Sequence, residues 1–405
     1  MAVPYPARSQ APRRCTSALL FALALTFAGA GPAFAASPPS AVPVPGPTPI
    51  GGPMLTGTSP LADVPLGVPQ PPPLAAASYL LADLTTGEVL AAKAPHARAL
   101  PASTLKMLTA LTVVPLLSPS QRYTAVPQDV VDGSKVGMSP GSSYTVQQLL
   151  HAMMLSSGND AATGLARAAG GVPQTVAMMQ EQARALGALD TVVKDPSGLD
   201  APGQATSAYD LALIARAALQ LPEIQQLVAT KQARFPGKSE PGKARTSYEI
   251  QNHNSLLRNY PGAIGIKNGY TVAARWTIVG AATRGDKTYV VTALTRTDRS
   301  WRPTAALLDW AFTYGGQARP IGHLVEPGGA GGAANPTAAA RPDDALAAAR
   351  EPFEAPAGMP LRTWVGAGGL ASAALVVSVL GLSARARRRQ LRAARAARYA
   401  RLRSR

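Results

Sequence analysis

The sequence predicts an α+β protein in which one antiparallel sheet is built from both ends of the folded chain. Helices lie on the faces of this sheet, and a transmembrane helix follows near the C-terminus. Two strand-like runs, 78–84 and 88–92, open the folded region, and strand-like runs return between 263 and 294 after a long helical stretch. Because strands occur at both ends with helices between them, the first and last segments are expected to pair in one sheet. The transmembrane helix is predicted from an uncharged apolar run at 365–383.

Residues 1–35 have the pattern of a secretory signal peptide. A basic start precedes a run of small and apolar residues, and Ala33-Phe34-Ala35 supplies small residues at the cleavage positions. The single cysteine, Cys15, lies in this peptide, so the mature chain is expected to contain no disulfide, no catalytic thiolate and no cysteine metal site. Residues 36–73 contain 13 prolines, a composition typical of an extended linker.

The predicted folded domain covers residues 74–317. It opens with a β-hairpin, because the runs 78–84 and 88–92 flank a turn at Thr85-Thr86-Gly87. Glycines and prolines separate the helical patterns of its middle part, which are 104–117, 145–156, 160–169, 173–186, 207–220 and 222–228. The late strands are expected at 263–270, 276–282 and 288–294, before a last helix at about 303–314.

The C-terminal part reads as a linker at 318–364, a transmembrane helix at 365–383 and a basic tail at 384–405. The 19 residues of the apolar run span about 28 Å as a helix, close to the hydrocarbon thickness of a bilayer. Ten arginines lie between 385 and 405, so much of the net charge of +17 belongs to the tail, and a nucleic-acid partner is not needed to explain it. By the positive-inside rule the tail is cytoplasmic, and the folded domain lies outside a cell membrane that the chain crosses once.

The stretch from Pro101 to Lys106 places a serine and a lysine at the start of an apolar run that predicts a buried helix. If the helix begins near Ser103, then Ser103 and Lys106 share one face, with Cβ atoms about 5–6 Å apart. A serine hydroxyl needs a base to act as a nucleophile, and a lysine can be that base if burial and nearby positive charge lower its pKa. The same pattern is also typical of a helix N-cap followed by a solvated lysine.

Two further stretches place polar groups where a cleft would need them. Residues 156–160, Ser-Ser-Gly-Asn-Asp, lie between two helical patterns, and the glycine lets polar side chains turn inward. Residues 265–271 belong to a late strand, where Lys267 beside a glycine suits an anionic group. Taken singly, the first stretch also fits ordinary helix caps and the second an ordinary strand-end lysine.

The three stretches occur in the order of the Ser-x-x-Lys, Ser-Asp-Asn and Lys-Thr-Gly motifs of penicillin-binding proteins and class A β-lactamases. Over about residues 75–317 the chain resembles the D-alanyl-D-alanine carboxypeptidase family, the low-molecular-mass penicillin-binding proteins. Text around the motifs matches as well, at 144–150, 195–200 and 252–257. The resemblance implies a β-lactamase/transpeptidase-like domain.

The resemblance also implies an activity. A membrane-anchored serine peptidase of this family removes the terminal D-Ala from peptidoglycan pentapeptide stems through an acyl-enzyme, here on Ser103. Its partners would be the peptidoglycan stem peptide, the membrane and β-lactam antibiotics as covalent inhibitors. No cofactor and no metal is expected.

The roles of the family's motif residues carry over to the matching positions. Ser103 would be the acylated nucleophile and Lys106 its base. Ser157 would relay protons to the leaving group, Asn159 would bind the substrate amide and orient Lys106, and Lys267 would support the relay and attract the substrate carboxylate. The substrate-binding set implied in this way is Asn159, Lys267, Asn268, Gly269, Tyr270 and Arg302.

Two parts of the implied site are less directly matched. The backbone N–H groups of Ser103 and Tyr270 would form the oxyanion hole. In relatives an arginine after the third motif clamps the terminal carboxylate, and Arg302 fits that position best, with Arg299 second.

The chain departs from the family pattern at two positions. Asn268 stands where the family usually has threonine or serine, and an amide donates from a longer, planar group than a hydroxyl does. Arg275 stands where the family often has glycine. These departures bear on catalytic strength and selectivity, and they favour one alternative function: a catalytically weakened muropeptide- or β-lactam-binding module.

Other enzyme classes fit less well. A class A β-lactamase needs a Glu-x-x-x-Asn pattern for its deacylating water, and none occurs between Asn159 and Lys267. A Ser-His-Asp hydrolase would need a suitable histidine, and the only candidates are His96, His151, His253 and His323. No two histidines have metal-ligand spacing on a helix.

Overall fold

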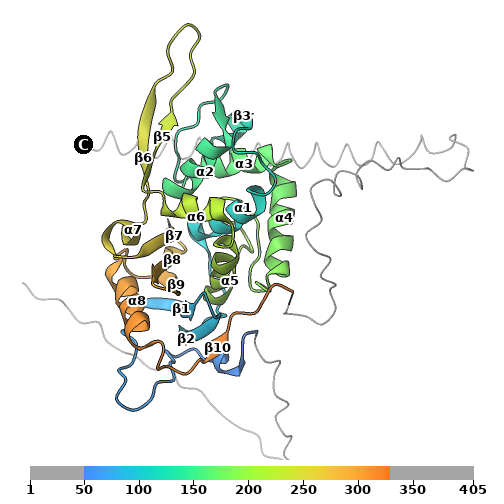
Figure 1. Cartoon of the computed structure of the whole chain (residues 1–405). Helices are drawn as coiled ribbons and strands as arrows, with labels where there is room; N and C mark the ends of the chain where they lie inside the picture. Colours follow the sequence, from blue (N-terminus) through green and yellow to red (C-terminus); the bar gives the residue numbers. More distant parts are fainter. Residues whose placement is uncertain (1–49, 329–405) are drawn as a thin grey trace, which may run out of the picture. The chain divides into compact units, whose positions relative to one another are not determined.

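A computed structural model of the chain describes residues 50–328 (Figure 1). In these residues a six-stranded sheet has the order β10-β2-β1-β9-β8-β7, and its strand pairs are antiparallel. The strands are β1 (Ala76–Asp83), β2 (Glu88–Lys93), β7 (Ala263–Thr271), β8 (Arg275–Arg284), β9 (Lys287–Arg296) and β10 (Gly322–His323). Strands from the start of the domain thus lie beside strands from its end, which confirms the predicted α+β fold with an antiparallel sheet.

The central strands are buried on both faces. Along β1, Leu80 and Ala82 belong to the core that the sheet shares with most of the helices, whereas Tyr79 and Leu81 belong to the core under the last helix, α8 (Arg302–Tyr314). Because side chains alternate along a strand, one strand can supply both cores. Figure 1 shows α8 on one side of the sheet and α5 (Ala208–Ala218) on the other.

The helices that cover the second face follow the predicted order. They are α1 (Lys106–Val113), α2 (Val146–Leu155), α3 (Asn159–Ala168), α4 (Val172–Ala185), α5 (Ala208–Ala218) and α6 (Pro222–Ala229). The first of them is shorter than the sequence predicts. It is preceded by a 3-10 turn, η2 (Ala102–Leu105), and it ends at Val113 because Pro115 has no N–H to continue the helical hydrogen bonds.

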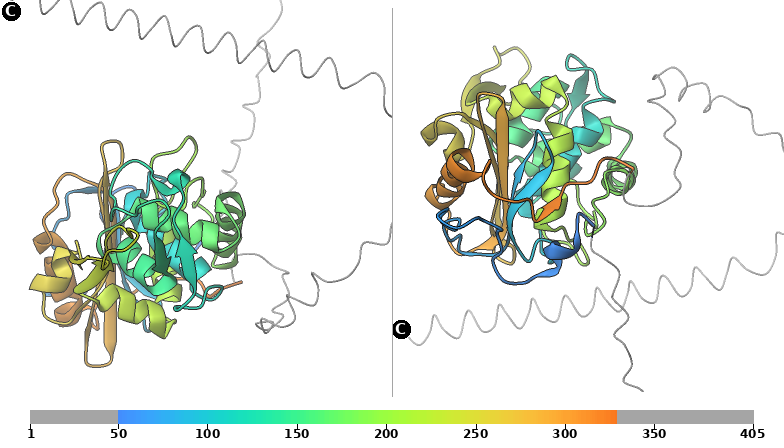
Figure 2. Two further views of the ribbon diagram at one scale, coloured as in Figure 1. Left: turned by 90° about the horizontal axis from the view of Figure 1, so that it is seen from above. Right: turned by 60° about the horizontal axis from the view of Figure 1, so that its bottom comes forward.

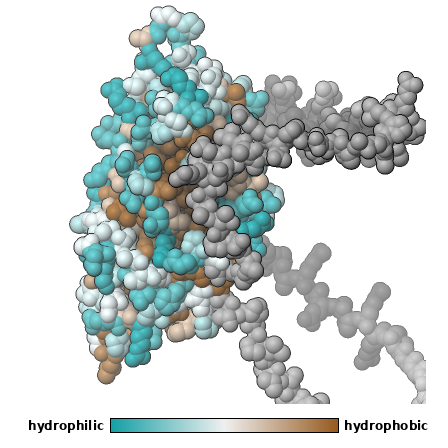
Figure 3. Space-filling model, turned by 45° about the vertical axis from the view of Figure 1, so that its right-hand side comes forward, coloured by the Kyte–Doolittle hydropathy of each residue, from teal (hydrophilic) through white to brown (hydrophobic). Residues whose placement is uncertain are grey.

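Several short elements were not predicted. They are η1 (Pro53–Thr56), β3 (Arg122–Thr124), η3 (Pro127–Asp129), β4 (Ser143–Thr145), β5 (Gln232–Pro236), β6 (Ser247–Gln251) and α7 (Ser255–Asn259). The β5–β6 hairpin buries only Phe235 and Ile250, so its strands lack the apolar alternation by which a strand is recognised. Its tip, at the top of Figure 3, carries mainly hydrophilic side chains.

Residues on the outer side of both predicted domain boundaries, 74 and 317, also pack on the domain. Leu55 is buried in the core, and Leu61 pairs with Ala92 of β2. The indole N–H of Trp310 donates to the Pro69 carbonyl at 2.8 Å. Prolines keep their carbonyl acceptors and side-chain bulk, so a proline-rich segment can pack without forming a strand. Figure 2 shows this blue segment running along the domain near β10.

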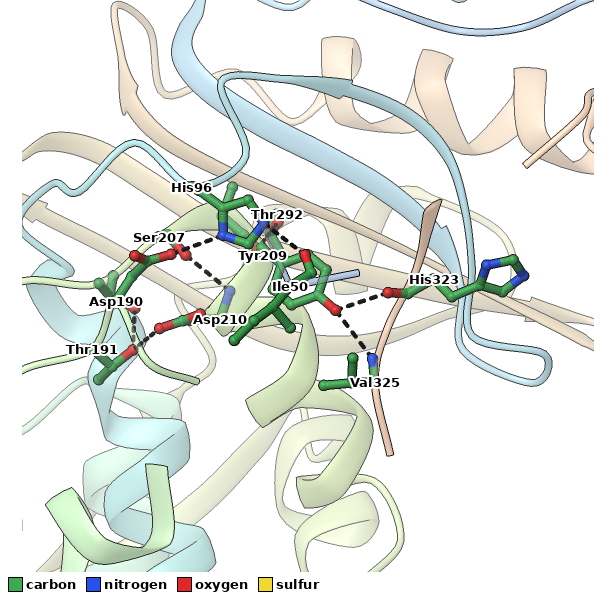
Figure 4. A network of polar contacts seen from close by, with 12 residues as sticks. Ile50, His96, Asp190, Thr191, Ser207, Tyr209, Asp210, Thr292, His323 and Val325 are labelled. Carbon is green, nitrogen blue, oxygen red and sulfur yellow. Dashed lines mark hydrogen bonds and ion pairs between the residues drawn. The ribbon is translucent and has the colours of Figure 1, made fainter. Parts of the chain in front are cut away.

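A polar network joins both ends of the described chain to the core (Figure 4). His96 contacts Asp190 through Nδ1 at 2.9 Å and the Ile50 carbonyl through Nε2 at 3.0 Å. The hydroxyl of Tyr209 donates to the His323 carbonyl at 2.8 Å. Two side chains of the domain therefore hold the segments that enter and leave it.

The predicted signal peptide, the apolar run 365–383 and the basic tail lie outside the described residues. Within residues 50–328, no helix has the length and apolar character needed to cross a membrane.

Candidate active site

Ser103 and Lys106 meet at the start of α1. Ser103 lies in the 3-10 turn η2 and Lys106 is the first residue of α1. The amine of Lys106 lies 2.9 Å from the Ser103 hydroxyl. Ala102 has a positive φ of 47°, and Gly198 packs on it so closely that a Cβ at 198 would lie 1.9 Å from the Ala102 carbonyl oxygen. The glycine is therefore needed for the turn that presents Ser103.

Lys106 is fully buried, and its amine has two further partners. These are the Asn159 side-chain oxygen at 2.7 Å and the Ser197 carbonyl at 2.6 Å. Burial and, after it, the positive charge of Lys267 hold the pKa of Lys106 well below its usual range, and the charges of Asp195 and Asp160 oppose this only in part. A neutral amine can donate to two acceptors and still accept the proton of the Ser103 hydroxyl.

The second motif lies between α2 and α3. Ser157 is buried and has a positive φ of 60°, and Asn159 is the first residue of α3. Asn159 donates to the Asp132 carbonyl at 2.7 Å while its oxygen accepts from Lys106, so both ends of the amide are held. The structure thus brings Ser103, Lys106 and Asn159 into one hydrogen-bonded group.

Two aspartates that the sequence reasoning did not single out support this group. Asp160 accepts hydrogen bonds from the backbone N–H groups of Val136, Gly137 and Met138, and so fixes the loop in front of α3. Asp195 accepts from the backbone and hydroxyl of Ser197. This holds the loop whose carbonyl faces Lys106.

The signal for the second aspartate was available in the sequence. Residues 195–200 match the sequence of the resembled family, but such a match does not show that the Ser197 carbonyl contacts Lys106. That contact is made across 91 residues of chain.

The third motif lies on β7, which forms one edge of the sheet. Lys267 is 1% exposed and donates to the Asn268 carbonyl at 2.8 Å. Burial lowers the pKa of Lys267 to about 7. At Gly269 a Cβ would lie 2.6 Å from the backbone nitrogen of Ser103, so β7 passes directly against the turn that holds the serine. Tyr270 is about half exposed and packs on Trp276, with ring centroids 4.4 Å apart.

Asn268 faces a large cavity beside the catalytic group. The cavity measures about 900 Å³ and does not include Ser103, but it reaches the site at Asn268 and Thr277. Both arginines considered for the carboxylate clamp, Arg302 and Arg299, line it. Arg302 is exposed, and its guanidinium lies 5.5 Å from the centre of the Trp301 ring. Arg275, the second departure from the family pattern, has a positive φ of 60° at the start of β8.

Within residues 50–328, no group of three or more His, Cys, Asp or Glu side chains could hold a metal ion. The chemistry that the site offers is nucleophilic acyl transfer. It has a half-buried serine hydroxyl, a buried lysine held ready as a base, an amide that orients the lysine, and a second buried lysine on the adjacent strand.

Comparisons with known proteins found a matching family model and similar relatives. The family model described as D-alanyl-D-alanine carboxypeptidase matches residues 67–296. The D-alanyl-D-alanine carboxypeptidase DacB2 of Mycobacterium tuberculosis is 42% identical over 269 residues, which cover 64% of this chain and 89% of the relative.

Two solved structures are also similar. A D-alanyl-D-alanine carboxypeptidase of M. tuberculosis matches with a TM-score of 0.60 and 41% identity, over 64% of this chain and 99% of that one. The DD-transpeptidase of Streptomyces K15 matches with a TM-score of 0.57 and 30% identity, over 60% of this chain and 100% of that one.

Proposed function

Because the chain belongs to the D-alanyl-D-alanine carboxypeptidase family and is a serine-type peptidase, we propose that it removes the terminal D-Ala from peptidoglycan stem peptides through an acyl-enzyme on Ser103. The observation that carries this proposal is the group formed by Ser103, Lys106 and Asn159. In it a buried amine lies 2.9 Å from the nucleophile and is fixed by an amide at 2.7 Å.

In the proposed first step, the Ser103 hydroxyl attacks the carbonyl carbon of the penultimate D-Ala and gives its proton to Lys106. The amide C–N bond breaks, and the leaving D-Ala amine takes up a proton through Ser157. The backbone N–H groups of Ser103 and Tyr270 stabilise the oxyanion. In the second step a water molecule attacks the ester, releases the shortened peptide and returns the proton to the serine.

The positions of the two lysines support a division of labour. Lys106, whose pKa is held well below the usual range by burial and by the charge of Lys267, acts as the base. When protonated, Lys267 attracts the terminal carboxylate together with Arg302. Asn268 and Gly269 follow Lys267 on strand β7. A β-lactam carries a strained amide and a carboxylate, placed relative to each other as the scissile amide and terminal carboxylate of the peptide are. Penicillin therefore acylates Ser103 by the same first step.

The proposal includes a cellular location. The signal-peptide pattern of residues 1–35, the apolar run 365–383 and the arginines that follow it support a single-pass membrane protein. The peptidase domain lies outside the membrane and the tail in the cytoplasm. This location places the site on the side where peptidoglycan is found.

A second candidate is a module that binds muropeptides or β-lactams with little turnover. Asn268 favours it, because an amide takes the place of a hydroxyl beside the substrate carboxylate. Both candidates predict acylation by penicillin, but only the enzyme releases D-alanine with many turnovers.

One experiment tests function and location together. Intact cells that express the full chain are treated with a fluorescent penicillin that does not cross the membrane, and membranes are assayed for D-alanine release from a pentapeptide. We expect a labelled band in the membrane fraction, shedding of the label by protease added outside, and multiple turnovers. Ser103→Ala should abolish the label and lower kcat/KM by at least about a thousandfold, because nucleophile and base act as a unit.

The control is Ser118→Ala, which changes an exposed serine beyond α1 and should leave both signals intact. Labelling of Ser103→Ala at another serine would overturn the nucleophile. Label that external protease cannot reach would overturn the orientation. Labelling with a single turnover would favour the binding module.

A further inference from the structure

The cavity beside Asn268 is larger than a terminal alanine requires. At about 900 Å³ it falls in the range of pockets that hold drug-sized ligands, roughly 300–1,000 Å³. Its wall comes from three segments: the stretch before and within α7, the facing parts of β7 and β8, and the turn between β9 and α8. We call this space the basic cavity.

The wall of the basic cavity has an excess of positive charge. Four arginines line it, Arg258, Arg296, Arg299 and Arg302, and the one acidic side chain among the lining residues is Asp298. A carboxylate oxygen of Asp298 accepts from Arg296 at 3.1 Å and from the Ser300 backbone at 2.7 Å. The acid is thus already engaged. Arg302 is assigned above to the terminal carboxylate, which leaves Arg258 and Arg299 with no carboxylate among the lining residues.

Two buried donors in this wall lack acceptors. Arg296 is 2% exposed and Asn254 is 1% exposed. The Nε of Arg296 and the side-chain nitrogen of Asn254 have no hydrogen-bond partner among the described residues. Buried donors are normally satisfied, so these two unpaired N–H groups add to the positive potential of the wall.

The start of helix α8 adds to the positive potential of the basic cavity. Ser300, Trp301 and Arg302 line the cavity where this 13-residue helix begins. Trp301 provides no side-chain cap, and the first turn of α8 contains no acid. The Ser300 hydroxyl accepts from the Arg302 backbone N–H at 3.3 Å, but no acid in the first turn offsets the positive end of the helix dipole.

The cavity lies on the leaving-group side of the proposed reaction. In that reaction the terminal carboxylate lies near Lys267 and Asn268, and the residue that bears this carboxylate is the one released. The cavity meets β7 at Asn268. The side chain and the carboxylate of the released residue are attached to the same Cα, so the side chain lies close to Asn268, where the cavity meets the strand.

We propose that the basic cavity binds a second carboxylate carried by the leaving residue, so that the chain accepts a D-amino-acid leaving group with an acidic side chain in preference to a neutral one of equal size. This inference rests on the proposed function, because it assigns the leaving-group side of the same site. The bond broken is the same amide, and the released product is an acidic D-amino acid in place of D-alanine.

The test compares three peptides with a common acyl half that end in D-Ala-D-Ala, D-Ala-D-Glu and D-Ala-D-Gln. The last two differ in charge and hardly in size. For the full chain we expect kcat/KM for the D-Glu peptide to exceed that for the D-Gln peptide by roughly ten- to a hundredfold, the range of a charge-assisted hydrogen bond. The measured quantity is the ratio of these two kcat/KM values, so a loss of activity that affects both peptides equally does not change it.

The variants Arg258→Gln and Arg299→Gln should each bring the ratio down several-fold toward one. The matched control is Arg234→Gln, which removes the same charge from exposed β5, outside the cavity. It should leave the ratio at the wild-type value.

The outcomes separate this inference from the function on which it rests. Turnover of D-Ala-D-Ala with a wild-type ratio near one would refute the second carboxylate site and leave the carboxypeptidase intact. A preference for D-Glu that neither cavity variant reduces would refute the assignment to this cavity. Failure to cleave any of the three peptides and to react with penicillin would refute the proposed function, and this inference with it.

Discussion

At the scale of single residues, the site depends on two buried lysines, Lys106 and Lys267. Neither Lys106 nor Lys267 forms an ion pair among the described residues. Burial lowers both pKa values, and the charge of Lys267 lowers that of Lys106 further. One amine is therefore available as a base, while the other keeps its proton only up to about neutral pH.

This pair predicts a pH profile of kcat/KM. Activity on a peptide with a free terminal carboxylate should rise with pH as Lys106 loses its proton. It should fall again as pH passes about 7, where Lys267 loses the charge that attracts the carboxylate. Above that pH the loss should reach roughly ten- to a hundredfold. Lys267→Arg keeps the cation, so its decline should move well above neutral pH.

The control substrate is the same peptide with an amidated C-terminus. It carries no carboxylate, so its kcat/KM should lack the alkaline decline in the wild-type chain. An unchanged decline in Lys267→Arg would show that another group titrates there.

At the scale of elements, the site depends on how closely strand β7 approaches the turn η2. Gly269 is the contact point. A Cβ added to it would lie 2.6 Å from the Ser103 backbone nitrogen and 2.6 Å from the Thr277 hydroxyl oxygen. Thr277 of β8 in turn donates to the Pro101 carbonyl at 3.1 Å. The sheet edge and the nucleophile turn are therefore fixed to each other by contacts that leave no space for a methyl group.

Gly269→Ala should consequently disturb the serine more than the fold. We expect the rate of penicillin labelling to fall roughly a hundredfold, the effect of a misplacement of about 1 Å, with a stability loss of about 1–3 kcal/mol from overpacking. Labelling rate and thermal unfolding measure the two effects. Gly316→Ala is the matched control, because its nearest neighbour would be 3.7 Å away and its φ is not positive. A normal labelling rate in Gly269→Ala would mean that β7 does not position Ser103.

At the scale of the whole described chain, the network of Figure 4 connects the domain's two ends to its interior. Asp210 lies in this network, 1% exposed, and accepts from the Thr191 hydroxyl at 2.7 Å. Burial raises the pKa of Asp210 to about 7. Burial lowers the pKa of His96, but its contacts with Asp190, the Ile50 carbonyl and the charge of Asp210 together outweigh this, and the net direction is upward.

A raised carboxyl pKa makes stability fall with rising pH. The unfolded chain releases the Asp210 proton near pH 3.8, whereas the folded chain keeps it to about pH 7. Between these values the folded state binds more protons, so the free energy of unfolding decreases as pH rises. Asp210→Asn removes this dependence. Between pH 5 and pH 8 the wild-type chain should lose about 1–3 kcal/mol relative to Asp210→Asn, at about 1.4 kcal/mol per pKa unit.

Urea unfolding at the two pH values measures this difference, and effects of the active-site lysines cancel because both proteins contain them. Asp286→Asn changes an exposed carboxyl between β8 and β9 and should behave as the wild type does. Parallel pH curves for the wild type and Asp210→Asn would contradict the proposed titration.

Much of the architecture could be predicted from local sequence. Hairpin β1–β2 follows from its turn, the middle helices from their periodicity and breakers, and the late strands from their apolar runs, because these patterns act between near neighbours in the chain. The three motifs identify Ser103, Ser157, Asn159 and Lys267 as one set through their order. The β5–β6 hairpin and the packing of residues 50–73 were not visible, because they depend on a few long-range contacts.

The chemistry of the site depends on contacts that no local pattern contains. Whether Lys106 is a solvated lysine or a neutral base is decided by its burial and by Lys267, which lies far along the chain. The Ser197 carbonyl, the loop held by Asp160 and the basic cavity likewise bring together segments separated by tens of residues. Residue types and their order thus follow from the sequence, whereas desolvation and charge proximity exist only in the folded chain, because both depend on distance in space.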